Sequence, residues 1–148
     1  MKGLIFMITI LVVLSNVQCK KEDQGVKDDK IIQDYIAKNN LIATKHSSGL
    51  YYVIKTEGSG NNPTINNTVT VNYKGFLTDG TMFDGTTTKP ATFPLANLIP
   101  GWQIGIPLIK KGGEIKLLLP SSLAYGTRGS GPIGPNEVLI FDIQLVSF

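Results

Sequence analysis

From Leu50 to the C-terminus, apolar and polar side chains alternate in short segments that are separated by glycine, proline and asparagine. An alternation with a period of two is typical of strands that bury one face. The glycine-rich residues 58–63 and the Asp79-Gly80 pair predict turns between such strands. Strands are predicted over residues 50–55, 68–73, 114–119 and 138–148, with a further strand beginning at residue 82.

Only one helix is predicted in this part of the chain, over residues 102–109, and Pro107 limits it to about two turns. Strands joined by short turns around one small helix favour the α+β class. The expected architecture is an antiparallel sheet that curls over this helix.

Residues 1–18 differ from the rest of the chain and are predicted to be an export signal. Lys2 is followed by an apolar run over residues 4–14. As a helix, this run would measure about 16 Å, roughly half of the ~30 Å thickness of the hydrocarbon core of a bilayer. It is therefore too short to serve as a membrane anchor. Cys19 is the only cysteine, which excludes an intramolecular disulfide.

Cys19 directly precedes the hydrophilic residues 20–25, an arrangement similar to that of bacterial lipoproteins, whose signal ends at an acylated cysteine. Gln18 departs from the Gly, Ala or Ser that usually precedes such a cysteine. We expect Cys19 to carry a lipid that attaches the exported protein to a membrane, in the periplasm or at the outer membrane. The alternative is ordinary cleavage nearby, which would leave a soluble secreted protein with a free thiol.

Residues 19–30 are rich in both lysine and acidic side chains and are predicted to be a solvated tether. Residues 31–48 are expected to hold one short amphipathic helix and a connector. The helix is placed at residues 29–39, with Asp28 and Asp29 capping its start. Its apolar face is formed by Ile31, Ile32, Tyr35 and Ile36. Because so short a helix is expected to pack on the domain, the sequence favours a monomer.

The remaining composition excludes several classes of function. The formal net charge is only +3, and lysines are scattered among acidic residues without a basic stripe, which argues against a nucleic-acid partner. His46 is the only histidine and lies in a polar connector, so no metal site or catalytic base is predicted. Residues 126–134 are rich in glycine but lack the Gly-Lys-Ser/Thr ending of a phosphate loop. Ser121 and Ser122 have no neighbouring base that would activate a nucleophile.

Six aromatic residues, each framed by glycine, proline or aspartate, are spread over about seventy residues. They are Tyr73, Phe83, Phe93, Trp102, Tyr125 and Phe141. Taken singly, each aromatic would more often be a core residue. No single element could hold all of them, so any shared pocket must form between distant segments. In this order and spacing, over residues 49–148, they resemble the FKBP-type peptidyl-prolyl cis-trans isomerases.

The resemblance implies a half-barrel sheet wrapped around one short helix, an aromatic slot for a proline ring, and neither cofactor nor metal. It also implies roles for individual residues. Three polar side chains are assigned to catalysis, namely Tyr73, Asp84 and Tyr125. The residues assigned to substrate binding are Phe83, Phe93, Leu98, Ile99, Trp102, Ile133 and Phe141, with Trp102 as the floor beneath the proline ring. The Ile99 N–H and the Tyr125 hydroxyl would bond substrate carbonyls, and Ile133 would lie in a flap over residues 127–135.

Two positions depart from the pattern of the family. Ala91 stands where many members carry an aromatic residue, and Pro100 replaces a polar residue before Gly101-Trp102. The loss of one wall is expected to weaken the binding of large macrolides more than the turnover of proline-containing polypeptides. The sequence thus predicts an exported, lipid-anchored prolyl isomerase. Two alternatives remain: a holdase chaperone on the same fold, and a surface lipoprotein whose aromatic residues stack on sugars.

Overall fold

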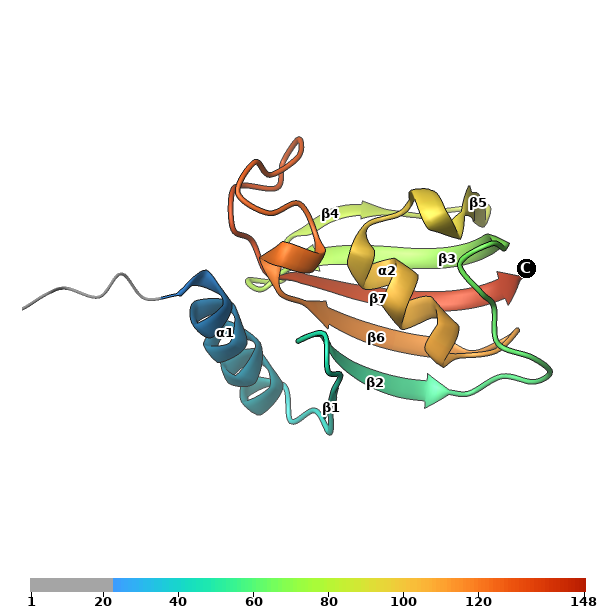
Figure 1. Ribbon diagram of the computed structural model, residues 1–148, viewed down its shortest axis with the longest axis horizontal. Coiled ribbons are helices and arrows are strands. Elements are labelled where there is room, and N and C mark those ends of the chain that lie inside the picture. The colour runs from blue at the N-terminus through green and yellow to red at the C-terminus, as the bar shows by residue number, and fades with distance from the viewer. Residues whose placement is uncertain (1–22) are drawn as a thin grey trace, which may run out of the picture.

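The computed structural model describes residues 23–148, which form one antiparallel sheet with two α-helices (Figure 1). The seven strands have the order β1-β2-β6-β7-β3-β4, and β5 also pairs with β3. One edge of β3 pairs with β7. Along its other edge, the first half of β3 pairs with β5 and the second half with β4. The strands are β1 (Thr44–Lys45), β2 (Tyr51–Thr56), β3 (Thr68–Leu77), β4 (Met82–Gly85), β5 (Ala91–Pro94), β6 (Glu114–Leu119) and β7 (Leu139–Ser147).

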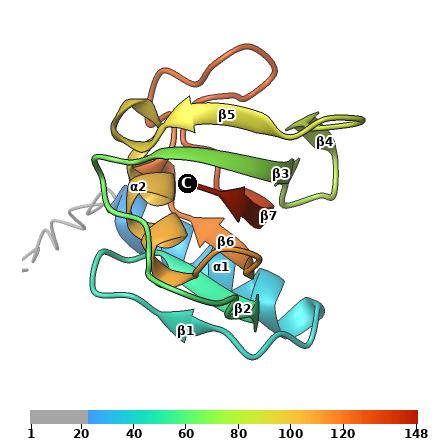
Figure 2. The ribbon, with the colours of Figure 1, turned by 90° about the vertical axis from the view of Figure 1, so that its right-hand side faces the viewer.

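Helix α2 (Pro100–Gly105), extended by the 3₁₀ turn η2 (Ile106–Leu108), lies on the inner face of the sheet (Figure 2). Gly101 and Gly105, one helical turn apart, face β6. A Cβ atom at Gly101 would collide with the Leu119 side chain, and one at Gly105 with the Leu117 side chain. The two glycines therefore allow the helix to lie close against the sheet, above a core of inward-facing side chains from β3, β6 and β7.

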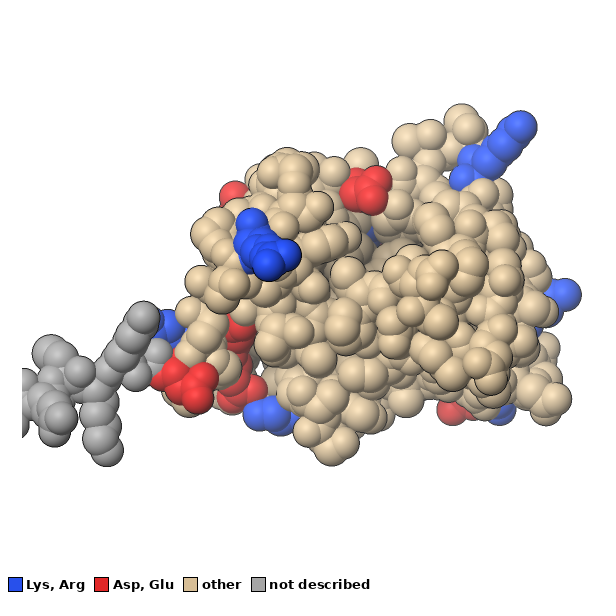
Figure 3. All heavy atoms as spheres, turned by 45° about the horizontal axis from the view of Figure 1, so that its top comes forward, with Lys and Arg blue, Asp and Glu red and all other residues tan. Residues whose placement is uncertain are grey.

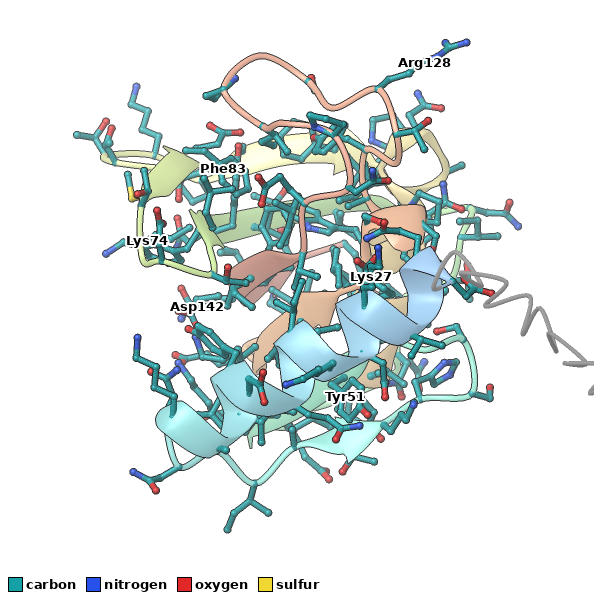
Figure 4. The ribbon with its side chains drawn as sticks, turned by 90° about the vertical axis from the view of Figure 1, so that its left-hand side faces the viewer. Lys27, Tyr51, Lys74, Phe83, Arg128 and Asp142 are labelled. Carbon is teal, nitrogen blue, oxygen red and sulfur yellow. The ribbon has the colours of Figure 1, made fainter. Side chains whose placement is uncertain are left out.

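Helix α1 (Gln24–Lys38) covers part of the opposite, outer face, as Figure 4 shows. A second apolar cluster joins Ile32 of this helix to side chains of β2, β6 and β7. The sheet is thus packed on both faces, and the predicted α+β fold with an antiparallel sheet around one short helix is confirmed.

The predicted start of α1 is wrong. The helix begins at Gln24 and is capped by Asp23, whose side chain accepts a 2.9 Å hydrogen bond from the Gly25 N–H. Residues 24–30 are therefore helical rather than part of a solvated tether. Asp28, expected to cap the helix, lies inside it and is buried, because its carboxylate has partners within the domain. Composition indicated polarity correctly but could not reveal these partners.

Smaller differences concern both faces of the helix and the short strands. Ile31, assigned to the apolar face of α1, is 40% exposed, whereas Ile32 is fully buried. The short strands β1 and β5 were not predicted, because segments of two and four residues carry too little alternation.

The predicted export signal and Cys19 lie outside the described residues. Within residues 23–148, no helix combines the length and the hydropathy needed to cross a bilayer.

Candidate active site

Trp102, at the start of α2, is the centre of a cluster of aromatic rings contributed by four separate elements. Its ring centroid lies 5.1 Å from that of Tyr73 on β3, 5.2 Å from that of Phe141 on β7, and 6.5 Å from that of Phe93 on β5. The three interplanar angles are 80–88°, so each pair meets edge to face, an arrangement that aromatic pairs favour. The indole is only 4% exposed.

Phe83 joins this cluster through Phe141, with ring centroids 5.6 Å apart and an interplanar angle of 88°. Gly75 permits the contact, because it pairs with Phe141 across β3 and β7 and lies beneath both rings. A Cβ atom at Gly75 would lie 2.6 Å from the Phe83 ring and 2.9 Å from the Phe141 ring. Any other residue would displace these two rings, so the arrangement of the cluster requires glycine at position 75, which the sequence analysis did not identify. In the sequence, Gly75 is marked only by its place two residues after Tyr73.

Two tyrosines and one aspartate supply polar groups at the edge of the cluster. The Tyr73 hydroxyl donates a 2.8 Å hydrogen bond to Asp84 Oδ2, and the Gly85 N–H donates a 2.8 Å bond to Asp84 Oδ1. Burial, together with the hydrogen bond to Asp84, raises the pKa of Tyr73 to about 12. Burial and the nearby charge of Asp84 also raise the pKa of Tyr125. Both phenols are therefore protonated hydrogen-bond donors at neutral pH.

The segment before α2 is held in place by Gln103. Its side-chain amide donates hydrogen bonds to the carbonyls of Ala96 (3.0 Å) and Leu98 (2.7 Å). Leu98 and Ile99 are partly buried against the inner core. Ile99 is the N-cap residue of α2, and its carbonyl accepts a 2.9 Å hydrogen bond from the Trp102 N–H. Gln103 thus fixes the backbone around Ile99, a role that could not be recognised from the sequence.

The Trp102 indole N–H is a buried donor with no hydrogen-bond partner, and it is the only such side-chain atom in the described part of the chain. An unpaired buried donor costs free energy, and such groups often mark functional sites. Here the donor belongs to the residue at the centre of the aromatic cluster.

The loop expected to form a flap follows the 3₁₀ turn η3 (Ser121–Leu123), at the top of Figure 1. Reciprocal 2.9 Å backbone hydrogen bonds between Ser130 and Ile133 close its tip. Ile133 turns inward, is only 7% exposed, and belongs to the inner core cluster. Tyr125 lies at the base of this loop and remains 38% exposed.

Figure 3 shows a hollow between two lobes on this side of the molecule, bordered mainly by residues other than Lys, Arg, Asp and Glu, with one acidic group at its upper rim. A second hollow, of about 670 Å³, lies on the outer face and is polar. Its charged and amide groups bond one another, including Lys55 with Asp142 (3.0 Å) and Asn72 with Gln144 (2.9 Å). The outer hollow therefore does not suit an apolar ring, whereas the aromatic cluster does.

The structure brings together the aromatic residues predicted from the sequence. Ring contacts join Tyr73, Phe83, Phe93, Trp102 and Phe141. The same core cluster includes Leu98, Ile99 and Ile133. Tyr125 lies near enough to Asp84 for the charge of Asp84 to raise the pKa of the Tyr125 phenol. The catalytic and binding roles assigned to these residues stay predictions.

An open antiparallel sheet with an aromatic slot over one short helix is the arrangement that prolyl isomerases of the FKBP type use. Comparison with known proteins agrees: residues 60–146 match the model of the family described as FKBP-type peptidyl-prolyl cis-trans isomerase. The chain belongs to this family.

Several bacterial proteins are similar to this chain in sequence. FkpA of Escherichia coli K12, an FKBP-type peptidyl-prolyl cis-trans isomerase, is 42% identical over 139 residues, which cover 90% of this chain and 51% of FkpA. The outer membrane protein MIP of Legionella longbeachae is 43% identical over 131 residues, covering 86% of this chain and 55% of MIP. This chain thus spans about half the length of the curated relatives it matches.

Two crystal structures are similar in fold. That of Escherichia coli FkpA superimposes with a TM-score of 0.75 at 40% identity, over 84% of this chain and 59% of FkpA. That of a peptidyl-prolyl cis-trans isomerase from Pseudomonas syringae gives a TM-score of 0.71 at 30% identity, over 85% of this chain and 96% of that protein.

Proposed function

We propose that this protein catalyses the cis-trans isomerisation of peptide bonds that precede proline, in polypeptides that fold outside the cytoplasm. The observation that carries the proposal is the cluster of aromatic rings around Trp102, with the hydroxyl of Tyr73 hydrogen-bonded to Asp84 at its edge. Membership in the isomerase family supports the same activity.

The reaction makes and breaks no covalent bond, so the site needs no nucleophile. Rotation about the prolyl bond is slow because it disrupts amide resonance, at a barrier of ~18–20 kcal/mol. The planar imide is the more charge-separated form, which water stabilises, and twisting reduces this separation. A site that removes water from the imide and fits its twisted form therefore lowers the barrier.

The described residues supply such a site. The rings of Trp102, Phe141 and Phe93 give rigid apolar surfaces against which a proline ring can pack. The protonated hydroxyl of Tyr125 would donate a hydrogen bond to a substrate carbonyl, and so would the Ile99 N–H at the start of α2. Asp84 holds the Tyr73 hydroxyl and adds a negative charge at the edge of the slot. Ile133 would cover the substrate from the flap.

The test is an isomerisation assay on a short prolyl peptide, in which the rate is measured by coupling to proteolysis or by NMR exchange. We expect a rate well above the uncatalysed rate, and a large loss in the Trp102→Ala and Asp84→Ala variants. A rate equal to the uncatalysed one, with unfolded chains still bound, would instead support the holdase alternative. Full activity in both variants would refute the assigned slot and favour the sugar-binding alternative.

We also propose that the protein is an exported monomer anchored by a lipid on Cys19, at the outer membrane or in the periplasm. The apolar run before Cys19 supports export, and the names of relatives such as outer membrane protein MIP agree with such a location. Mass spectrometry of the protein extracted from membranes tests the anchor, and an unmodified Cys19 in the mature protein would refute it.

A further inference from the structure

The geometry points to Asp28 of α1 as a positioning residue for Tyr125, acting through Ser121. Asp28 and Ser121 are the only polar side chains that are fully buried within residues 23–148, at 1% and 2% exposure. They bond each other although they lie 93 positions apart in the chain. The inference rests on the proposed function, because it assumes that the Tyr125 hydroxyl acts on the substrate.

The contact is a pair of hydrogen bonds to one carboxylate oxygen. Asp28 Oδ2 accepts a 2.8 Å bond from the Ser121 N–H and a 2.6 Å bond from the Ser121 hydroxyl. The other oxygen, Oδ1, accepts a 2.7 Å bond from the side-chain amide of Gln24. Within residues 23–148, the hydrogen-bond partners of this carboxylate are all neutral donors, and no cation forms a salt bridge with it.

Asp28 takes the place of a missing cap. Ser121 is the first residue of η3, and the residue before it, Pro120, makes no side-chain capping bond. The first N–H groups of a helical turn need an outside acceptor, which a neighbouring Ser, Thr, Asp or Asn usually provides. Here a carboxylate from α1, on a distant part of the chain, caps η3 instead.

The capped turn leads directly to Tyr125. The Ser121 carbonyl accepts a 3.0 Å hydrogen bond from the Ala124 N–H and a 2.9 Å bond from the Gly126 N–H, the residues on both sides of Tyr125. The Gly126 carbonyl in turn accepts a 2.8 Å bond from the Asn136 N–H, at the end of the flap loop. Asp28 holds Ser121 by its N–H and hydroxyl, and the carbonyl of the same residue holds the backbone on both sides of the Tyr125 ring.

Simple docking of α1 does not account for a buried carboxylate. Ile32 already packs the helix against the sheet, and burying a charged group is costly compared with burying an apolar side chain of similar size. A positioning role accounts for it, because the carboxylate orients a peptide whose position matters for the site. The outer-face helix would thus influence catalysis on the inner face.

Variants of the full chain can separate positioning from docking. Asp28→Ala removes both bonds to Ser121, and we expect kcat/KM to fall about tenfold, since small displacements of a catalytic group have large effects. Asp28→Asn should retain activity within about twofold, because its amide oxygen can accept both bonds while Gln24 rotates its amide. The matched control is Asp34→Ala on the same helix, whose side chain is 68% exposed, and it should leave kcat/KM unchanged.

The decisive measurement is a double-mutant cycle with Tyr125→Phe. If Asp28 acts through Tyr125, then adding Asp28→Ala to Tyr125→Phe should cause no further loss of kcat/KM. Equal losses in both backgrounds would overturn the inference, because the effect would then come from the fold as a whole. Should Asp28→Ala not fold, Ser121→Ala removes only the hydroxyl bond, and its smaller loss should also vanish in the Tyr125→Phe background.

Hydrogen exchange gives a readout that does not depend on activity. In Asp28→Ala, the amides of Ala124 and Gly126 should exchange faster, whereas that of Leu117 in β6 should not change. Unchanged exchange at Gly126 would overturn the inference. A Tyr125→Phe variant as active as the native protein would refute the role of Tyr125 in the proposed function instead, and the exchange data would still decide whether Asp28 orders this segment.

Discussion

The Tyr73 hydroxyl donates a 2.8 Å hydrogen bond to Asp84 Oδ2, beside the ring contact between Tyr73 and Trp102. This contact joins the inner face of β3 to β4, and it keeps a phenol protonated beside a carboxylate. The pKa of Tyr73 is raised to about 12, first by burial and then by Asp84.

The raised pKa predicts how stability depends on alkaline pH. Because the folded state holds the phenolic proton more tightly than the unfolded chain, its contribution is complete below pH 10 and is lost as the pH rises toward 12. After allowance for solvent screening, the loss in unfolding free energy should be on the order of 1 kcal/mol. Urea unfolding at pH 9 and pH 11.5 measures it, and Tyr73→Phe should show a smaller difference. An identical pH dependence in the two proteins would contradict this assignment.

Gly75→Ala should damage both the slot and the fold. The new methyl group would lie 2.6 Å from the Phe83 ring and would force it aside. We expect a destabilisation of about 1–3 kcal/mol, as for other overpacked cores, together with a loss of isomerase activity. Urea unfolding and kcat/KM measure the two effects. Gly25→Ala is the control, because the nearest contact of its Cβ atom is 3.5 Å away and no change in activity should follow. Native activity in Gly75→Ala would show that the position of Phe83 is unimportant.

Trp102 is the only tryptophan, so the fluorescence of the protein reports on the centre of the proposed slot. Binding of a prolyl peptide should change the intensity or wavelength of its emission, because the ligand would cover the indole and displace water near it. Titration with a peptide that contains proline measures this change, and the same peptide with alanine in place of proline is the control. Equal responses to both peptides would argue against a proline-specific slot.

Ala91→Tyr should strengthen the binding of macrolide inhibitors. Ala91 and Phe93 point to the same face of β5, since they are two residues apart in one strand, and Phe93 contacts Tyr73 and Trp102. An aromatic ring at position 91 would restore a wall that many family members have. We expect about tenfold tighter binding of a macrolide, equivalent to ~1.4 kcal/mol, with little change in peptide turnover. Calorimetry measures the affinity, and an unchanged value would contradict the predicted role of position 91 in macrolide binding.

Asp142→Asn should alter stability without altering activity. Asp142 lies on the outer face, where burial raises its pKa but hydrogen bonds and charges from Lys116 and Lys55 outweigh this effect and lower it. A lowered pKa stabilises the fold above the pKa of the unfolded chain, and the contribution is lost as the pH falls through the folded value. We expect a loss of about 1 kcal/mol at pH 7 for this partly exposed carboxylate, and a smaller loss at pH 3. A large fall in kcat/KM would contradict this prediction, because it would show that Asp142 itself affects the slot.

The aromatic cluster was largely predictable from the sequence, because its residues stand together in the order and spacing of a known family. Trp102 and Phe141 could be predicted to lie together even though they are on different elements, and their rings are in contact. Gly75 and Gln103 were missed, because their roles depend on atoms that only tertiary packing brings near. A glycine beside an aromatic indicates a turn or a close approach, and the sequence cannot distinguish the two.

The start of α1 could not be predicted for a different reason. Residues 24–30 have the charge pattern of a solvated segment, and Asp29 does pair at the surface with Lys45 at 2.7 Å. Asp28, next to it, points inward to a partner that is 93 positions away. Composition treats these two aspartates alike, since it records the chemistry of a side chain and not the direction in which it points.

The lengths of the outermost strands have a consequence for a protein that would meet unfolded polypeptides. At one border of the sheet, β1 contains only two residues, and at the other border β4 and β5 contain four residues each. Unpaired backbone at the border of a sheet is a template on which a foreign extended chain can add itself. Because these edge strands are so short, a polypeptide bound through its proline would find little backbone with which to form a further strand of the sheet, and this would favour its release.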